Sequence, residues 1–337
     1  MVTQKTIAEK LGISPSLVSR ALAGTAGNIG ASEETVRKIR ETARELGYTP
    51  NAAALVLRGA KSKTIGVVIK DFGDPFLGRM ISALQKEAAA SGCSLLLTGF
   101  DFAARQPRDA ASLLRYRPDA LFIGGSDICS GWIKPFLKAN IPIAQIGSDA
   151  DYPGVARVET DEEAGLRKLL DYVLAAGHRK LGFIGSDNGP HRRRRLILEK
   201  ELRQRRIKLG DVAFSIVTDG ENVGLRAMNE LLARGKARRP TAVLAADDAV
   251  AQGALRSIHN AGLTVPGDVS LTGIDDIPAA ELMIPALTTI RVPIGRMVEE
   301  AFRLVFHGGG EEKPPPRRLE PKLIERESCA APAAERR

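Results

Sequence analysis

The chain has 337 residues, which is long for one typical domain and predicts two or three. Its composition, 44% hydrophobic and 26% charged, excludes wholesale disorder, and no apolar run approaches the ~20 residues that would cross a membrane. The net charge of +9 is uneven, because residues 1–63 and 191–208 are strongly basic while the remainder is mildly acidic. A basic N-terminal segment on an acidic body predicts that this segment alone binds a polyanion.

The cysteines and the N-terminus bear on the cellular compartment. Cys93, Cys129 and Cys329 are odd in number, far apart and not in CxxC pairs, so we expect no complete disulfide framework and no zinc site. We also expect no cofactor. The N-terminus lacks the apolar core of a secretory signal and begins directly with a helical pattern. Both features favour the reducing cytoplasm.

Residues 4–22 predict two short helices. The apolar positions at helical spacing are Ile7, Ala8, Leu11, Val18, Ala21 and Leu22. Gly12 ends the first helix, Ser14 is placed to cap the second, and Pro15 suits its first position. Two short helices joined by a tight turn form a helix-turn-helix, whose second helix enters the DNA major groove. An ordinary helical hairpin is the alternative.

A third helix and a linker follow. Residues 23–31 predict a loop, and Ser32 caps the next helix. The buried stripe of this helix is Val36, Ile39, Ala43 and Leu46, and the helix ends at Gly47 and Pro50. These elements predict a DNA-binding domain at residues 1–50. A short helix-prone segment at 51–58 and a basic linker at 59–63 then form a predicted hinge at 51–63.

Several motifs follow one another along the chain. They are VSRAL (18–22), ELGYTPNAAA (45–54), TIGVVI (64–69), GHRKLGFIG (177–185), PTAVLAADDAVAQGAL (240–255), VPGDVSLTGIDD (265–276) and PALTTI (285–290). In this order they resemble the LacI/GalR (lac repressor) family of bacterial transcription regulators, and the resemblance covers nearly the whole chain.

The body, residues 64–337, alternates apolar runs with helical stretches. The runs lie at 64–69, 94–97, 120–123 and 141–146, and in a second series at 180–184, 214–217, 242–244 and 269–272. Continuous apolar strands separated by amphipathic helices predict parallel sheets covered on both faces. The fold class is therefore an all-α helix-turn-helix head plus an α/β body of two doubly wound parallel-sheet subdomains. The resemblance implies a periplasmic-binding-protein-like body, with an N-subdomain (64–160 and 292–318), a C-subdomain (161–291 and 319–328), and the helix around 294–306 returning to the first.

Polar side chains follow most predicted strands. They are Asp71, Asp74, Asp101, Ser126, Asp127, Ser148, Asp149, Ser186, Asp187, Asp219, Asp247, Asp248, Asp275 and Asp276. Ligands of open parallel sheets bind beyond the carboxyl ends of the strands, so these residues predict a cleft for a polyhydroxylated ligand. Each aspartate also has an alternative role as a helix cap.

The resemblance implies an effector site. Its predicted residues are Asp71, Phe72, Phe76, Ser126, Asp127, Arg194, Asp247 and Asp275, and for the two phenylalanines core packing is the alternative. The family's Arg-x-x-Gly-Phe reads Arg-Arg-Leu-Ile-Leu at 194–198, so Arg195 is the alternative to Arg194. The family's usual Asn-Asp pair is Asp-Asp at 247–248, and Gly147 stands where many members have aspartate. These departures predict an unusual ligand.

The sequence HRRRR at 191–195 places four arginines near a predicted helix N-terminus. There they oppose the helix dipole by about 0.3–1 kcal/mol each. An anion would relieve this, so a sugar acid or sugar phosphate is a candidate effector beside a neutral sugar. A solvated basic face, or ion pairs with Glu199 and its neighbours, is the alternative.

The head and hinge supply the expected DNA contacts. Arg20 is the predicted direct reader, since a guanidinium grips guanine bidentately for ~1–3 kcal/mol. The other predicted DNA-binding residues are Thr6, Ser14, Pro15, Ser16, Ser19, Asn51, Ala54 and Leu57. The resemblance implies that Leu57 wedges into the minor groove. Lys5, Lys61 and Lys63 are candidates for phosphate contacts, which would make binding strongly salt-dependent.

These observations together predict a cytoplasmic transcriptional repressor that binds double-stranded operator DNA as a homodimer or tetramer, under effector control and without a membrane partner. Effector binding is expected to close the cleft and to order or melt residues 51–58. The rival is a cytoplasmic solute-binding sensor without operator-specific DNA binding. An enzyme is disfavoured, because His178 and His259 accompany no nucleophile motif or metal spacing, and His178 is expected to make a structural hydrogen bond.

Overall fold

The computed structural model describes residues 2–23, 31–49, 61–101, 106–125, 130–147, 152–307 and 315–332. The chain divides into two compact units, Met1–Ser62 and Lys63–Arg337. The predicted hinge residues Asn51, Ala54 and Leu57, and the effector candidates Ser126 and Asp127, lie outside the described residues.

The N-terminal unit contains the three predicted helices, α1 (Gln4–Leu11), α2 (Pro15–Leu22) and α3 (Glu33–Glu45). The side chains of Thr3, Ser14 and Ser32 each accept a hydrogen bond from a backbone amide in the first turn of their helix. Gly12 ends α1 with a φ of +63°. The buried core consists of Ile7, Ala8, Val18, Ala21, Ile39 and Ala43. The helix-turn-helix prediction is confirmed.

The first sheet of the body has the strand order β12-β6-β5-β4-β1-β2-β3. Its strands are β1 (Thr64–Ile69), β2 (Ser94–Asp101), β3 (Gln106–Pro107), β4 (Ala120–Gly124), β5 (Ile143–Ile146), β6 (Val155–Thr160) and β12 (Arg317–Leu319). Neighbouring strands are parallel except β2 and β3. One face is covered by α5 (Pro75–Ala90) and α13 (Ile294–His307), the other by α6 (Ala110–Arg115), the turn η2 (Ser130–Ile133) and α7 (Lys134–Lys138).

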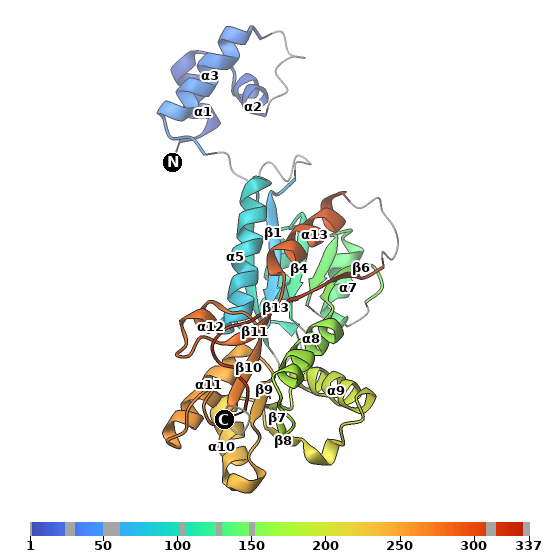
Figure 1. Cartoon of the computed structure of the whole chain (residues 1–337). Coiled ribbons are helices and arrows are strands. Elements are labelled where there is room, and N and C mark those ends of the chain that lie inside the picture. Colours follow the sequence, from blue (N-terminus) through green and yellow to red (C-terminus); the bar gives the residue numbers. More distant parts are fainter. Residues whose placement is uncertain are drawn as a thin grey trace. The chain divides into compact units, whose positions relative to one another are not determined.

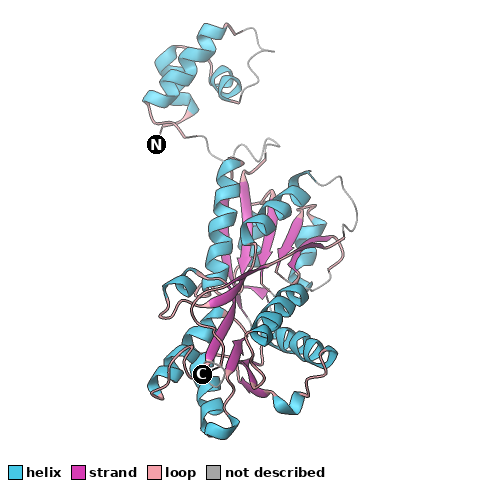
Figure 2. Cartoon of the chain, viewed as in Figure 1, coloured by secondary structure: helices cyan, strands magenta, loops and turns pink. Residues whose placement is uncertain are grey.

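The second sheet has the order β13-β11-β10-β9-β7-β8. Its strands are β7 (Leu181–Ser186), β8 (Ala213–Val217), β9 (Ala242–Ala245), β10 (Ser270–Asp275), β11 (Thr288–Arg291) and β13 (Lys322–Ile324), parallel except for β11 with β13. Helices α8 (Glu162–Ala175) and α9 (Gly189–Gln204) cover one face, and α10 (Val223–Ala233) and α11 (Asp248–Asn260) cover the other (Figures 1 and 2). The short elements are η3 (Leu209–Asp211), η4 (Lys236–Arg238) and α12 (Pro278–Leu282).

The described chain passes between the two sheets three times: after β6, after β11, and between β12 and β13. Met297, Val298 and Ala301 of α13 pack in the core of the first sheet. The predicted fold class of two doubly wound parallel-sheet subdomains is confirmed. The C-terminal strands β12 and β13 are only two residues apart along the chain but belong to different sheets. Among the described helices, none has the length and apolar character needed to cross a membrane.

The C-terminal segment is anchored to the second subdomain. Ser328 Oγ donates to the carbonyl of Leu271 and accepts from the amide of Thr288. His178 is 1% exposed, with Nδ1 2.9 Å from Thr241 Oγ1 and Nε2 2.8 Å from the carbonyl oxygen of Ala330. The predicted structural role of His178 is confirmed.

Candidate functional site

Helix α2 carries an exposed polar surface. Pro15, Ser16 and Arg20 are exposed, and Ser14 caps the helix while its Oγ lies 3.0 Å from Ser16 Oγ. Arg20 Nε donates to the carbonyl of Ser16.

Two predicted DNA-binding residues have other surroundings. Thr6 lies on α1, where it is exposed and forms a capping box with Thr3. Ser19 is only 9% exposed. Ser19 follows Val18 directly and lies at the edge of the buried stripe of α2. It is therefore not on the exposed face of the helix, where it was predicted to be.

A cleft of about 1150 Å³ lies at the carboxyl ends of the strands of both sheets. Asp71, Asp74 and Phe76 line it from the segment after β1 and the start of α5. The second sheet contributes His191, Arg193 and Arg194 from α9, Asp219 after β8, Asp247 after β9 and Asp275 at the end of β10. The position of this cleft agrees with the one expected from the polar strand ends.

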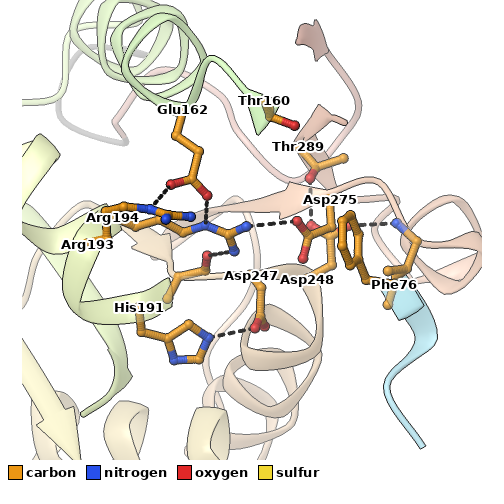
Figure 3. Close-up of polar contacts among 12 residues, drawn as sticks. Phe76, Thr160, Glu162, His191, Arg193, Arg194, Asp247, Asp248, Asp275 and Thr289 are labelled. Atoms are coloured by element: carbon orange, nitrogen blue, oxygen red, sulfur yellow. Dashed lines mark hydrogen bonds and ion pairs between the residues drawn. The ribbon is translucent and has the colours of Figure 1, made fainter. Parts of the chain in front are cut away.

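Arg194 is the central cation of the cleft and is 8% exposed. Its Nε donates to Glu162 Oε1 at 3.1 Å, its Nη1 to the carbonyl of Ala246 at 2.7 Å, and its Nη2 to Asp275 Oδ1 at 3.1 Å (Figure 3). Burial lowers the pKa of this guanidinium, but Asp275 and Glu162 outweigh burial and raise the pKa above its usual value. Arg194 is therefore a fixed positive charge whose three nitrogens all have protein partners.

Arg194 and its neighbours Arg193 and Arg195 differ in their partners and in whether they line the cleft. Arg195 pairs with Glu199 at 3.4 Å and does not line the cleft. Arg193 does line it, and its Nε donates to Glu162 Oε2 at 2.6 Å. Arg194, and not the alternative Arg195, therefore belongs to the candidate site.

Phe72 and Phe76 differ in their exposure and in whether they line the cleft. Phe72 is 53% exposed, its ring lies against Gly99, and it is not part of the cleft lining. Phe76 lines the cleft and packs against the cores of both subdomains. We therefore keep Phe76 in the candidate site and remove Phe72.

Asp247 and Asp74 each line the cleft and also cap a helix, the two roles between which the sequence did not decide. Asp247 Oδ1 accepts from the amide of Val250 and caps α11, while its Oδ2 accepts from His191 Nε2 at 2.7 Å. Burial raises the pKa of Asp247, but these hydrogen bonds hold it below its usual value. Asp74 caps α5, and burial raises its pKa. Capping therefore fixes the carboxylates that line the cleft.

Acidic side chains form ion pairs with the basic side chains on and around α9. Glu162 pairs with Arg193 and Arg194, Glu163 with Lys200, and Glu201 with Arg167 and Arg205. Except for Glu201 with Arg205, which lie four residues apart at the end of α9, these pairs run between α8 and α9, which lie side by side in Figure 1. The ion-pair alternative is confirmed, and helix-dipole strain no longer argues for an anionic effector.

The predicted effector set lacked Glu162, Arg193 and His191, although Arg193 and His191 belong to the HRRRR run that the sequence analysis singled out. Glu162 belongs to an Asp-Glu-Glu run that follows β6, and β6 was not among the predicted strands. Asp74 and Asp219 were among the polar strand ends but outside the predicted effector set. Among the described residues, no group of three or more His, Cys, Asp or Glu side chains is arranged to hold a metal ion.

A helix-turn-helix head followed by a two-sheet body with a polar cleft defines a class of DNA-binding regulators with a ligand-receptor body. The periplasmic binding protein-like domain family matches residues 170–329. The HTH-type transcriptional regulator GalR of Salmonella typhimurium is 30% identical, over 98% of this chain and 97% of its own. The repressor PurR of Escherichia coli is also 30% identical, over 98% of this chain and 97% of its own.

Solved structures share the fold. A lac repressor dimer bound to operator and the anti-inducer ONPF matches with a TM-score of 0.82 at 24% identity, over 98% of this chain and 99% of that one. A complex of the regulator CelR with cellobiose matches with a TM-score of 0.68 at 25% identity, over 98% and 100%. The chain belongs to the LacI/GalR family of transcriptional regulators. Its curated relatives are regulators and not enzymes, and they do not favour the alternative of a sensor without DNA binding.

Proposed function

We propose that this protein is a repressor that binds operator DNA as a homodimer and changes its operator affinity when a small polyhydroxylated effector occupies the cleft. The observation that carries the proposal is the presence, in one chain, of an exposed capped helix α2 and a large cleft whose charged groups come from both sheets. The first part reads DNA and the second senses a metabolite.

The relatives support each partner. The lac repressor match contains a dimer on its operator, the CelR match contains cellobiose, and PurR is named a repressor. We extend these properties to this chain: double-stranded DNA, a sugar-like effector, and a dimer or a tetramer built from dimers. A protein acting on bacterial DNA works in the cytoplasm, which is the location we propose.

The proposed sites keep the predicted residues with the changes described above. DNA contacts come from Thr6, Ser14, Pro15, Ser16, Arg20, Asn51, Ala54 and Leu57. The effector contacts are Asp71, Asp74, Phe76, Ser126, Asp127, His191, Arg193, Arg194, Asp247 and Asp275. We assign residues 1–50 to the DNA-binding domain, 51–63 to the hinge and 64–337 to the effector-binding body.

Cleft closure is the proposed route from effector to DNA. The two subdomains are joined by the crossovers after β6, after β11 and between β12 and β13, so a ligand held by both sheets changes their relative orientation. That change is transmitted to the proposed hinge at 51–63, which orders or melts and so sets operator affinity.

Selection of duplexes from a random library by the full chain, followed by gel shifts at two salt concentrations, tests the proposal. We expect enrichment of a pseudo-palindromic site, and a steep fall in affinity with salt because phosphate contacts release counterions. A chain that lacks residues 1–60 is the control and should enrich nothing. If the full chain shows no preference among duplexes, the proposed function is wrong.

A further inference from the structure

Most of the positive charges that line the cleft already have acidic partners. Among the described lining residues, ten carry carboxylates and six are Lys or Arg. All three nitrogens of Arg194 have protein partners, and Arg193 pairs with Glu162. Arg167 and Arg318 likewise pair with Glu201 and Glu159. The cleft therefore has an excess of negative charge, and four of its six lining cations already have acidic partners.

Asp74 and Asp275 are two of the cleft carboxylates that keep an acceptor atom available. Asp74 Oδ1 accepts from the amides of Phe76 and Leu77, and Asp275 Oδ1 accepts from Arg194. The Oδ2 atom of each has no hydrogen-bond partner among the described residues, although Asp275 is only 6% exposed. An acceptor at a buried position that lines a cavity calls for a donor from the ligand.

These two carboxylates belong to different subdomains. Asp74 precedes α5 on the first sheet, and Asp275 ends β10 on the second. Burial raises the pKa of Asp275. The positive charge of Arg194 lowers this pKa, but the negative charges of Asp247, Asp248 and Asp74 act in the same direction as burial, and the pKa stays above its usual value. Asp74 and Asp275 thus repel each other across the cleft.

A cation between the carboxylates of Asp74 and Asp275 would attract both of them and so replace their mutual repulsion. An ammonium group has three donors and no acceptor, so it can donate to both free oxygens and keep a third bond for water. Two charge-assisted hydrogen bonds would then join the two sheets where like charges previously faced each other.

We propose that the effector of this cleft carries a protonated amino group, as an amino sugar does, and that Asp74 and Asp275 hold this ammonium between the two subdomains. The proposal rests on the proposed function in taking the cleft as the effector site. It assigns a cationic polyhydroxylated compound, rather than a neutral sugar or a sugar acid, as the ligand class.

Titration calorimetry on the full-length protein at pH 7 tests the ligand class. The probes are D-glucosamine, D-galactosamine and D-mannosamine, each compared with its parent hexose and with the corresponding uronic acid. We expect at least one amino sugar to bind about tenfold or more tightly than its parent, because a charge-assisted hydrogen bond is roughly twice as strong as a neutral one. If no amino sugar binds more tightly than its parent, or if a uronic acid binds more tightly, the proposal is overturned.

Two matched variants locate the ammonium. Asp74→Asn removes the charge but keeps a capping oxygen, and it should lower the preference for the amino sugar over its parent about tenfold. Asp109→Asn is the control, because Asp109 caps α6 in the same way but does not line the cleft, and it should leave the preference unchanged. An unchanged preference in Asp74→Asn would overturn the assignment, and Asp275→Asn provides a second variant with the same expected loss.

Gel shifts on the same preparations separate the two proposals. Loss of sequence-specific DNA binding would count against the proposed function, whereas the ranking of amine, neutral and acidic probes is measured without DNA and decides the ligand class.

Discussion

Asp248 is a buried carboxyl directly beside the cleft residue Asp247, and it is fully enclosed. Its oxygens accept from Thr289 Oγ1 and from the amide of Ile277. Burial nevertheless raises the pKa of Asp248 to about 7. The unfolded value is about 4, so folding takes up a proton between these two pH values.

This shift predicts a pH dependence of stability. The contribution of Asp248 is complete below about pH 4 and is lost as the pH rises through about 7, at a slope of up to ~1.4 kcal/mol per pH unit. Asp248→Asn should remove this component, so that its free energy of unfolding falls less steeply than that of the wild type between pH 5 and pH 7. Urea denaturation across this range measures the two slopes.

The control for this prediction is Asp268→Asn. Asp268 is exposed, and the amide and hydroxyl of Thr264 lower its pKa, so this carboxyl affects stability only in more acidic solution. Equal slopes for the wild type and Asp248→Asn would show that Asp248 does not titrate in this way.

Arg194 holds together the charges at the centre of the cleft. Substitution by methionine keeps a long side chain but leaves Asp275 without its cation and Glu162 with Arg193 alone. We expect Arg194→Met to lower the free energy of unfolding by about 3–5 kcal/mol, the usual effect of breaking a buried ion pair.

Arg192→Met tests whether this loss is specific to the buried position. Arg192 is exposed on the same helix and donates to the carbonyl of Asp187, so its substitution should cost no more than ~1 kcal/mol. Chemical denaturation compares the two variants, and similar losses would contradict the central role of Arg194.

Elements differ in how far their sequences reveal them. The apolar run of β1 is buried along five of six residues and was predicted with its observed bounds. Strand β6 was not predicted because Arg157 and Glu159 interrupt its apolar residues. In the structure these charges pair with each other, and Arg318 of β12 also pairs with Glu159. A partner 159 residues away is a tertiary contact that local pattern does not contain.

The arginine run of α9 illustrates the same limit for the site. Leu198 and Leu202 are buried on α9, and Arg194 lies four residues before Leu198 on the same helical face. Arg195 lies three residues before Leu198, which is also same-face spacing, so the sequence alone does not distinguish the two arginines. The pairing of Arg193 and Arg194 with Glu162 was beyond sequence reasoning, because it depends on how α8 packs against α9.

Helix α2 is the element that carries the proposed base recognition. If α2 lies in the major groove, Arg20→Ala should weaken operator binding by ~1–3 kcal/mol and relax specificity at one base pair. Arg37→Ala on α3 is the control, because Arg37 is a similarly exposed cation of the head that pairs with Glu41. Gel shifts with operator point variants measure both, and equal weakening by the two substitutions would place base reading elsewhere.

At the scale of the whole body, contacts between the subdomains converge on one turn. Asp275 and Asp276 both have positive φ, +112° and +53°. Arg79 of α5 reaches across from the first sheet and donates to the carbonyls of both residues. Arg291 and Arg326 hold the carboxylate of Asp276 from the second sheet. The turn that carries a cleft carboxylate is therefore fixed from both sides, so movement of one subdomain must change its contacts.

The proposed homodimer requires an apolar contact surface, and the body has one. Leu282 is 80% exposed and Ile284 is 90% exposed. Ile284 borders a depression whose lining is part apolar (Leu255, Leu263, Val265 and Pro285) and part polar (Gln252, Arg256, His259 and Thr264). Large apolar side chains that are exposed on a surface can mark a contact with a partner. Two-fold symmetry would place the same patch of a second copy against it.

The double variant Leu282→Asp, Ile284→Asp tests this surface. Both side chains are exposed, so the fold should remain intact by circular dichroism, while sedimentation should show a monomer because carboxylates do not desolvate at an apolar contact. Operator affinity should then fall about 100-fold or more, since two joined heads bind both half-sites with a high effective concentration and separate heads do not. Leu196→Asp on α9, where the leucine is 53% exposed, should leave both the dimer and operator affinity unchanged. A double variant that sediments as a dimer would place the dimer contact on another face of the body.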